Sequence, residues 1–153
     1  MQHIVSSCVS RIIVFKMKRL AYKLFDEVLS QAETSPRHRM HYDLRTSVEE
    51  QGWKDMSQRM LNVLMADTVI PIHRHKETNE VVIVMRGSGC EVLYDGQGNE
   101  LERIEMSASS DCTGVVVPKG AWHTFFAHED GTVIFEAKDR PYDPILTEEL
   151  LSL

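Results

Sequence analysis

The chain has 153 residues, of which 42% are apolar and 26% charged, and a formal net charge of −6. This length and composition are typical of one soluble globular domain. A mildly acidic chain lacks the basic face that nucleic acid and anionic membranes require, so we expect neither as a partner. No apolar run of the sequence approaches the roughly 20 residues that span a bilayer.

The three cysteines, Cys8, Cys90 and Cys112, are widely spaced, and no CxxC pair occurs. An odd number of cysteines without such a pair argues against a disulfide framework and for a reducing compartment. We therefore expect a cytoplasmic protein in which the cysteines are small hydrophobic residues rather than reactive thiols.

Residues 1–16 contain a short apolar core, Ile12–Phe15, but no small-residue cleavage site of a signal peptide. Two interpretations remain for this N-terminal extension. It is either an extra strand or arm, or a segment upstream of a domain that opens at Met17. We favour the second interpretation because a helical pattern starts at Met17.

Apolar residues at helical spacing predict one amphipathic helix over about 18–33. It ends at Ser35-Pro36, because the residue before a proline is pushed out of the helical region. The rest of the segment up to residue 58 is polar and irregular, and it contains a capping-box pattern, Ser47–Glu50, for one short helical turn.

From residue 59, short apolar runs alternate with turns rich in Gly, Asp and Asn. No helical pattern separates these runs, so we expect an all-β sandwich or barrel. We assign the helix and an Arg-rich segment to 17–58, the barrel to 59–146, and a tail with a last helical turn to 147–153. The expected strands are Met60–Met65, Val69–His75, Glu80–Arg86, Cys90–Tyr94, Leu101–Met106, Val115–Val117, Trp122–Ala127 and Thr132–Ala137.

Four residues carry the strongest chemical signal. His73 and His75 lie two apart on an expected strand, so both imidazoles point to one face. Glu80 follows a short polar turn and opens the return strand, where it can face the same histidines. His123 is the fourth candidate, and it follows a Pro118–Trp122 run. Three imidazoles and a carboxylate are a familiar ligand set for a divalent transition metal such as Fe, Zn, Ni or Mn.

The spacing of these residues resembles the two motifs of the cupin superfamily. The first motif is His73-x-His75-x4-Glu80-x6-Gly87, and the second is Pro118-x-Gly120-x2-His123. The resemblance implies a double-stranded β-helix, a jelly-roll barrel, with a metal bound inside by the three histidines and the glutamate. Two positions depart from the motifs: Asp67 stands where a glycine is usual, and Ala127 where an asparagine is usual.

From Met17 to about Pro144 the sequence is similar to the WbuC-type cupin-fold metalloproteins. The segments that carry this likeness are Ser35–Leu44, Gln58–Asn62, Phe135–Lys138 and Pro141–Pro144. The resemblance implies a bacterial protein linked to surface-polysaccharide, deoxy-sugar or sugar-nucleotide metabolism. Cupins commonly form homodimers, so a homodimer is also expected.

Other polar residues are candidates for binding a substrate. Arg37, Arg39 and His41 form either a clamp for an anionic small molecule or a solvated basic segment, and both interpretations stay open. Asn62 is a further candidate for substrate binding. Glu136 and Lys138 alternate with apolar residues on the last barrel strand. They are candidate acid–base groups if that face points into the barrel, although we slightly favour an exposed pair.

Two classes of function fit this sequence. The first is a metal-dependent enzyme acting on a small anionic or sugar-type substrate, for example an isomerase, an epimerase or a dioxygenase. The second is a non-catalytic binding or sensing module with a structural metal. A polar pocket that reaches the metal ligands and has Arg37 or Arg39 near it favours the enzyme, whereas a barrel packed solid favours the module.

Overall fold

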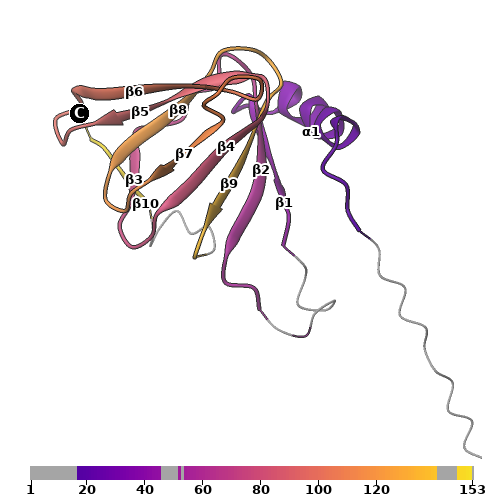
Figure 1. Ribbon diagram of the computed structural model, residues 1–153, viewed down its shortest axis with the longest axis horizontal. Helices are drawn as coiled ribbons and strands as arrows, with labels where there is room; N and C mark the ends of the chain where they lie inside the picture. The colour runs from indigo at the N-terminus through magenta and orange to yellow at the C-terminus, as the bar shows by residue number, and fades with distance from the viewer. Residues whose placement is uncertain (1–16, 46–51, 53, 141–147, 153) are drawn as a thin grey trace, which may run out of the picture.

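The computed structural model describes residues 17–45, 52, 54–140 and 148–152. The N-terminal extension, the Ser47–Glu50 pattern and the Pro141–Pro144 segment lie outside these residues. Two five-stranded antiparallel sheets and one helix make up the described chain (Figure 1). This architecture is the cupin jelly roll that the two motifs predict.

The helix α1 (Tyr22–Thr34) covers the outer face of the first sheet beside β1 and β2 (Figure 1). Its buried residues Phe25, Val28 and Ala32 follow a helical spacing and pack on residues of β2 and β9. The helix starts later than the predicted 18–33, and Ser35 has extended backbone at its C-terminus. The residue before Pro36 therefore ends the helix, as predicted.

The first sheet has the strand order β1-β2-β9-β4-β7, and the second has the order β10-β3-β8-β5-β6. Between them lies an apolar core of Leu64, Val82, Val84, Met106, Phe125, Ala127 and Ile134. This core fills one part of the barrel and leaves the part beside the motif residues polar. The strands are β1 (Arg39–Asp43), β2 (Gln58–Leu64), β3 (His73–His75), β4 (Glu80–Arg86), β5 (Ser88–Tyr94), β6 (Glu100–Ser107), β7 (Gly114–Val117), β8 (Trp122–Ala127), β9 (Thr132–Lys138) and β10 (Glu148–Leu150).

Strand β1 is a correction to the sequence analysis, which expects irregular structure over this polar segment. Met40 and Tyr42 pack against the helix cluster on the outer face. Arg39, His41 and Asp43 alternate with them and line the barrel cavity. A strand whose inner face is polar and whose outer face is covered by a helix does not have the usual apolar-inside pattern.

Two smaller corrections concern strand β3 and its partner. Within the expected strand over 69–75, only His73–His75 form a strand, and Val69 is 78% exposed. The expected helical turn over 147–151 is instead β10, which pairs with β3. Glu149 accepts hydrogen bonds from Arg74, so its side chain joins the two strands.

No helix among the described residues is long and apolar enough to cross a membrane.

Gly87, which closes the first motif, has a φ of 78°, and a Cβ added there would lie 2.8 Å from Thr132 Oγ1. Glycine is therefore required at this turn on grounds of both backbone conformation and space.

Candidate metal centre and ligand cavity

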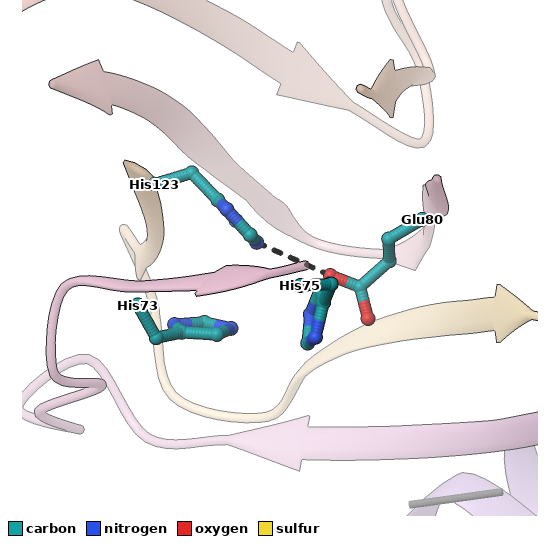
Figure 2. A group of neighbouring side chains, drawn as sticks. All are labelled: His73, His75, Glu80 and His123. Carbon is teal, nitrogen blue, oxygen red and sulfur yellow. Dashed lines mark hydrogen bonds and ion pairs between the residues drawn. The ribbon is translucent and has the colours of Figure 1, made fainter. Parts of the chain in front are cut away.

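The four motif residues converge inside the barrel. His73 and His75 come from β3, Glu80 from the start of β4, and His123 from β8 (Figure 2). Each offers a ligand atom, and all four atoms lie within 4.8 Å of one another. Three of the residues are buried and His73 is half-buried. The structure thus brings together the set that the sequence predicts.

Strand pairing explains this convergence. His73 lies directly opposite His123 in the β3–β8 ladder, and their ring centroids are 4.4 Å apart. His75 lies two residues along β3 on the same face. Glu80 belongs to the other sheet and reaches across the barrel, so the cluster contains side chains from both sheets.

Backbone carbonyls orient two of the histidines. Nδ1 of His73 lies 3.0 Å from the carbonyl oxygen of Pro71, and Nδ1 of His123 lies 2.9 Å from that of Ala121. A carbonyl only accepts, so Nδ1 carries the proton and donates in both residues. The lone pair is then left on Nε2, which is the tautomer that metal-binding histidines adopt.

The spacing of the ligand atoms fits one ion. Glu80 Oε2 lies 3.2 Å from Nε2 of His75 and 3.3 Å from Nε2 of His123. Atoms held about 2.0–2.2 Å from a common ion at octahedral or tetrahedral angles lie about 3.0–3.5 Å apart. Imidazole and carboxylate together suit Zn, Fe, Ni or Mn. The residues present therefore fit a divalent transition metal.

Burial and neighbouring charges set the protonation of the cluster. Burial lowers the pKa of His73 to about 3, which keeps its imidazole neutral at physiological pH. Burial alone would raise the pKa of Glu80, but its close contacts with His123 and His75 and the positive charge of the nearby Lys138 hold it well below its usual range. A neutral imidazole and an ionised carboxylate are the forms that bind a metal.

Glu136 and Lys138 face into the barrel, which corrects the preference for an exposed pair. The apolar face of β9 turns outward instead, where Val133 and Phe135 belong to the cluster beneath α1. Lys138 is only 6% exposed, and its Nζ lies 3.2 Å from Nδ1 of His75 and 3.6 Å from Oε1 of Glu80. Lys138 therefore contacts two of the four motif residues.

Asn62 also faces the interior and contacts Glu136. Its Nδ2 donates a hydrogen bond to Glu136 Oε1 at 3.4 Å. Burial and the negative charge of Glu80 raise the pKa of Glu136 to about 7, against the opposing effects of Asn62, Lys138 and Arg39. Glu136 can thus gain or lose a proton near neutral pH.

A cavity of about 300 Å³ connects these groups. Its wall includes His73, Glu80 and His123 of the cluster. Arg37, Arg39, His41, Asn62, Glu136 and Lys138, all singled out in the sequence, also line it. The volume is at the lower end of the range for small-molecule sites. All the candidate residues except His75 thus border one space.

The arginines of the cavity differ in how they are held. Arg45 forms an ion pair with Asp43, and Arg59 forms one with Asp55. Arg37 is exposed, and Arg39 is half-buried with Nη1 donating to the carbonyl oxygen of Val69 at 3.3 Å. Arg39 begins β1, the outermost strand of the first sheet, and Arg37 lies two residues before it in the chain.

Sequence reasoning missed Glu91, a polar residue of the cavity, whereas Gln58 was weighed evenly, like Asn62, between a role in binding and none. Glu91 is on β5 and Gln58 begins β2, and both are buried. Gly89, Glu91 and Leu93 lie two residues apart along β5 and therefore share one face of the strand. This spacing could have indicated that the carboxyl of Glu91 points inward with its neighbours. Burial raises the pKa of Glu91 to about 8.

A second group of potential ligands, Cys90, Glu105 and His128, lies away from the cavity. Nη1 of Arg103 donates to Cys90 Sγ at 2.9 Å, so a guanidinium already contacts the thiol. Glu105 and His128 are exposed and form an ion pair. We do not assign a metal to this group, because a cation there would be repelled by Arg103.

This protein therefore has the cupin fold, a jelly roll with a cluster of His and Glu side chains in its interior. The family model described as "Domain of unknown function (DUF6016)" matches residues 20–106, and the chain belongs to this family. No curated protein matches the sequence.

Solved structures with a similar fold include three proteins of different size. Capsular polysaccharide assembling protein CapF from Staphylococcus aureus is 20% identical over 66% of this chain and 28% of its own, with a TM-score of 0.57. Oxalate decarboxylase from Bacillus subtilis is 17% identical over 74% of this chain and 27% of its own, with a TM-score of 0.54. Protein SO0799 from Shewanella oneidensis is 14% identical over 83% of this chain and 84% of its own, with a TM-score of 0.61.

At such identities the likeness concerns the fold. The chain spans less than a third of CapF and of oxalate decarboxylase.

Proposed function

We propose that this cupin binds one divalent transition metal through His73, His75, Glu80 and His123 and is an enzyme that acts on a small anionic or sugar-type molecule. The observation that carries the proposal is the cavity of about 300 Å³ that reaches three of these residues and is also lined by Arg37 and Arg39. A metal with a purely structural role would need no such space beside it.

The charges around the cavity support an anionic ligand. Arg37 and Arg39 lie on the β1 side, and Lys138 lies beside the cluster. Arginine donates two parallel hydrogen bonds to a carboxylate or phosphate. A ligand with one acidic group can therefore contact the arginines while an oxygen elsewhere in the molecule faces the metal cluster.

The chain's own residues supply the remaining roles. Glu136 can hold or release a proton, and Asn62 keeps its carboxyl oriented by the hydrogen bond to Oε1. Lys138 holds Glu80 in its ionised form. When bound, the metal supplies Lewis acidity, which polarises a carbonyl or hydroxyl oxygen. Isomerisation, epimerisation and dioxygenation are all compatible with this arrangement.

The finer assignment to WbuC-type cupins, and with it a link to surface polysaccharide, belongs to this proposal. The segments that carry the likeness to WbuC-type proteins support this assignment, because their polar residues border the cavity. These residues are Arg37, Arg39, His41, Asn62, Glu136 and Lys138. CapF, which shares the fold, is a capsular polysaccharide assembling protein and points to the same area of metabolism. A cytoplasmic homodimer completes the proposal.

A thermal-shift screen with sugar phosphates tests this function. We expect stabilisation by one or more of these compounds when the protein is loaded with Zn²⁺ or Mn²⁺, and a weaker effect after chelation. Equal stabilisation with and without metal, or none in either state, would contradict the proposal. Product formation, followed by NMR on any compound that binds, then distinguishes an enzyme from a non-catalytic module.

A further inference from the structure

Within the described part of the chain, the carboxyl of Glu91 is buried inside the barrel without a hydrogen-bond partner. Glu91 is 6% exposed, and neither of its carboxyl oxygens has a hydrogen-bond partner among the residues that the structure describes. It lies directly opposite Phe125 in the β5–β8 ladder, between the His123 level and the apolar core. Its side chain lines the cavity. The strand pairing thus places the carboxyl of Glu91 at the boundary between the polar and the apolar parts of the barrel interior.

An isolated carboxyl at such a position is unfavourable for folding. Burying a polar group without a hydrogen bond costs about 1–3 kcal/mol, and burying an ionised one costs more. The raised pKa, about 8, shows the same penalty, and the charges of Glu80 and Glu136 add to it while His123 opposes it. In the metal-free protein near neutral pH the side chain is therefore mostly a carboxylic acid, which can both donate and accept a hydrogen bond.

Gln58 presents a second such atom to the same cavity. Its Oε1 is buried and has no partner among the described residues. Gln58 lies on β2 of the first sheet and Glu91 on β5 of the second. Gln58 Oε1 and the two carboxyl oxygens of Glu91 thus come from opposite sheets, and none of them has a donor among the described residues, so a molecule bound in the cavity can supply the donors. Hydroxyl groups are the simplest groups that donate to such oxygens.

We propose that Glu91 is a substrate-contacting residue that binds, together with Gln58, the hydroxyl groups of a polyhydroxylated acid whose anionic group lies at Arg37 and Arg39. This inference rests on the proposed function and narrows its substrate class to sugar acids or sugar phosphates. Acids without hydroxyl groups fit this cavity poorly, because Glu91 and Gln58 would remain unpaired in the complex.

Two probes of the same chain length and charge test this assignment. D-gluconate carries hydroxyl groups along its chain, whereas hexanoate carries none. We expect isothermal titration of the metal-loaded wild type to show a preference for D-gluconate. In Glu91→Leu that preference falls by about tenfold or more, because a hydrogen bond to a buried carboxyl is lost. Glu91→Gln, which can still donate and accept, retains most of it.

The matched control is Glu102→Leu, which makes the same change at an exposed position on β6. It should leave both affinities unchanged. The melting temperature provides a second readout, since removal of an unpaired carboxyl raises it or leaves it unchanged, whereas removal of a structural group lowers it. If Glu91→Leu does not fold, Glu91→Ala removes the same carboxyl and is interpreted in the same way.

Three results would overturn the inference. The wild type could show no preference for D-gluconate, the preference could persist in Glu91→Leu, or the melting temperature of Glu91→Leu could fall by several degrees. The metal content of each sample separates these outcomes from failure of the proposed function. A wild type that takes up no metal contradicts the proposed function, whereas a metal-loaded protein with an unchanged preference contradicts only the role of Glu91.

Discussion

Glu80 and His123 meet across the two sheets of the barrel, with Glu80 Oε2 lying 3.3 Å from Nε2 of His123. Glu80 opens β4 in the first sheet, and His123 lies on β8 in the second. A metal on these two residues would link the sheets at the end of the barrel that the apolar core does not fill. Metal binding and fold stability should therefore be coupled.

The first prediction concerns this coupling. Zn²⁺ at about 100 times its dissociation constant should stabilise the wild type by about 2.7 kcal/mol, because the ion binds the folded state alone. The measurement is the free energy of unfolding in urea, with and without metal. Glu80→Gln should lose most of the effect. His128→Ala, a substitution at an exposed histidine away from the cavity, should retain it.

The second prediction concerns the basic wall of the cavity. The double substitution Arg37→Gln and Arg39→Gln should weaken binding of inorganic phosphate by about tenfold or more while the metal content stays unchanged, because two charge-assisted contacts are lost. Titration calorimetry at low and high salt measures the effect, which should be smaller at high salt. Arg103→Gln, on the other sheet, is the control. Equal weakening by this control would indicate a general charge effect.

The third prediction follows from the raised pKa of Glu91, which is about 8 against an ordinary 4.5. The folded state retains a proton that the unfolded state releases, so this contribution to stability is complete below about pH 4.5 and is lost as the pH rises towards 8. Glu91→Gln should remove a slope of up to about 1.4 kcal/mol per pH unit between about pH 5 and 7. Urea unfolding at several pH values measures it, and parallel curves for both proteins would exclude the effect.

The fourth prediction concerns α1, which covers the outer face of β2 and β9. Phe25 is 4% exposed and belongs to the cluster beneath the helix. Phe25→Ala should lower the free energy of unfolding by about 3–5 kcal/mol. Tyr22→Ala is the aromatic control on the same helix, because Tyr22 is 66% exposed. A loss of similar size in both variants would mean that the helix contributes through its aromatic surface rather than through burial.

The motif residues could be placed from the sequence because strand geometry determines their positions. Side chains two residues apart on a strand share a face, so His73 and His75 had to point the same way. The short polar turn does not form the expected hairpin but carries the chain from β3 to β4 in the other sheet, where Glu80 faces the two histidines across the barrel. The positions of these three side chains depend on local spacing, which a single sequence contains in full. His123 required the second motif, since its contact with His73 joins strands far apart in the chain.

Two of the errors, at β9 and at β1, have a common cause, because helix α1 covers the outside of the barrel there. Sequence alternation shows that Glu136 and Phe135 lie on opposite faces, but it does not show which face is inside. Helix α1 packs over the outer side of β9, so the apolar residues face the helix and the polar ones face the cavity. Strand β1 was not predicted for the same reason, because its apolar residues Met40 and Tyr42 face the helix cluster and not the interior of the barrel. Glu91 was missed because a single glutamate within an apolar run carries no motif.

Elemental analysis of the protein purified from its own host tests the central claim most directly, since expression in another host can load the wrong ion. The account predicts about one equivalent of a single transition metal in the wild type, and a large loss of that metal in both His73→Ala and Glu80→Ala. The account would be contradicted by a wild type that holds no metal and takes up none on addition, or by variants that retain the full amount.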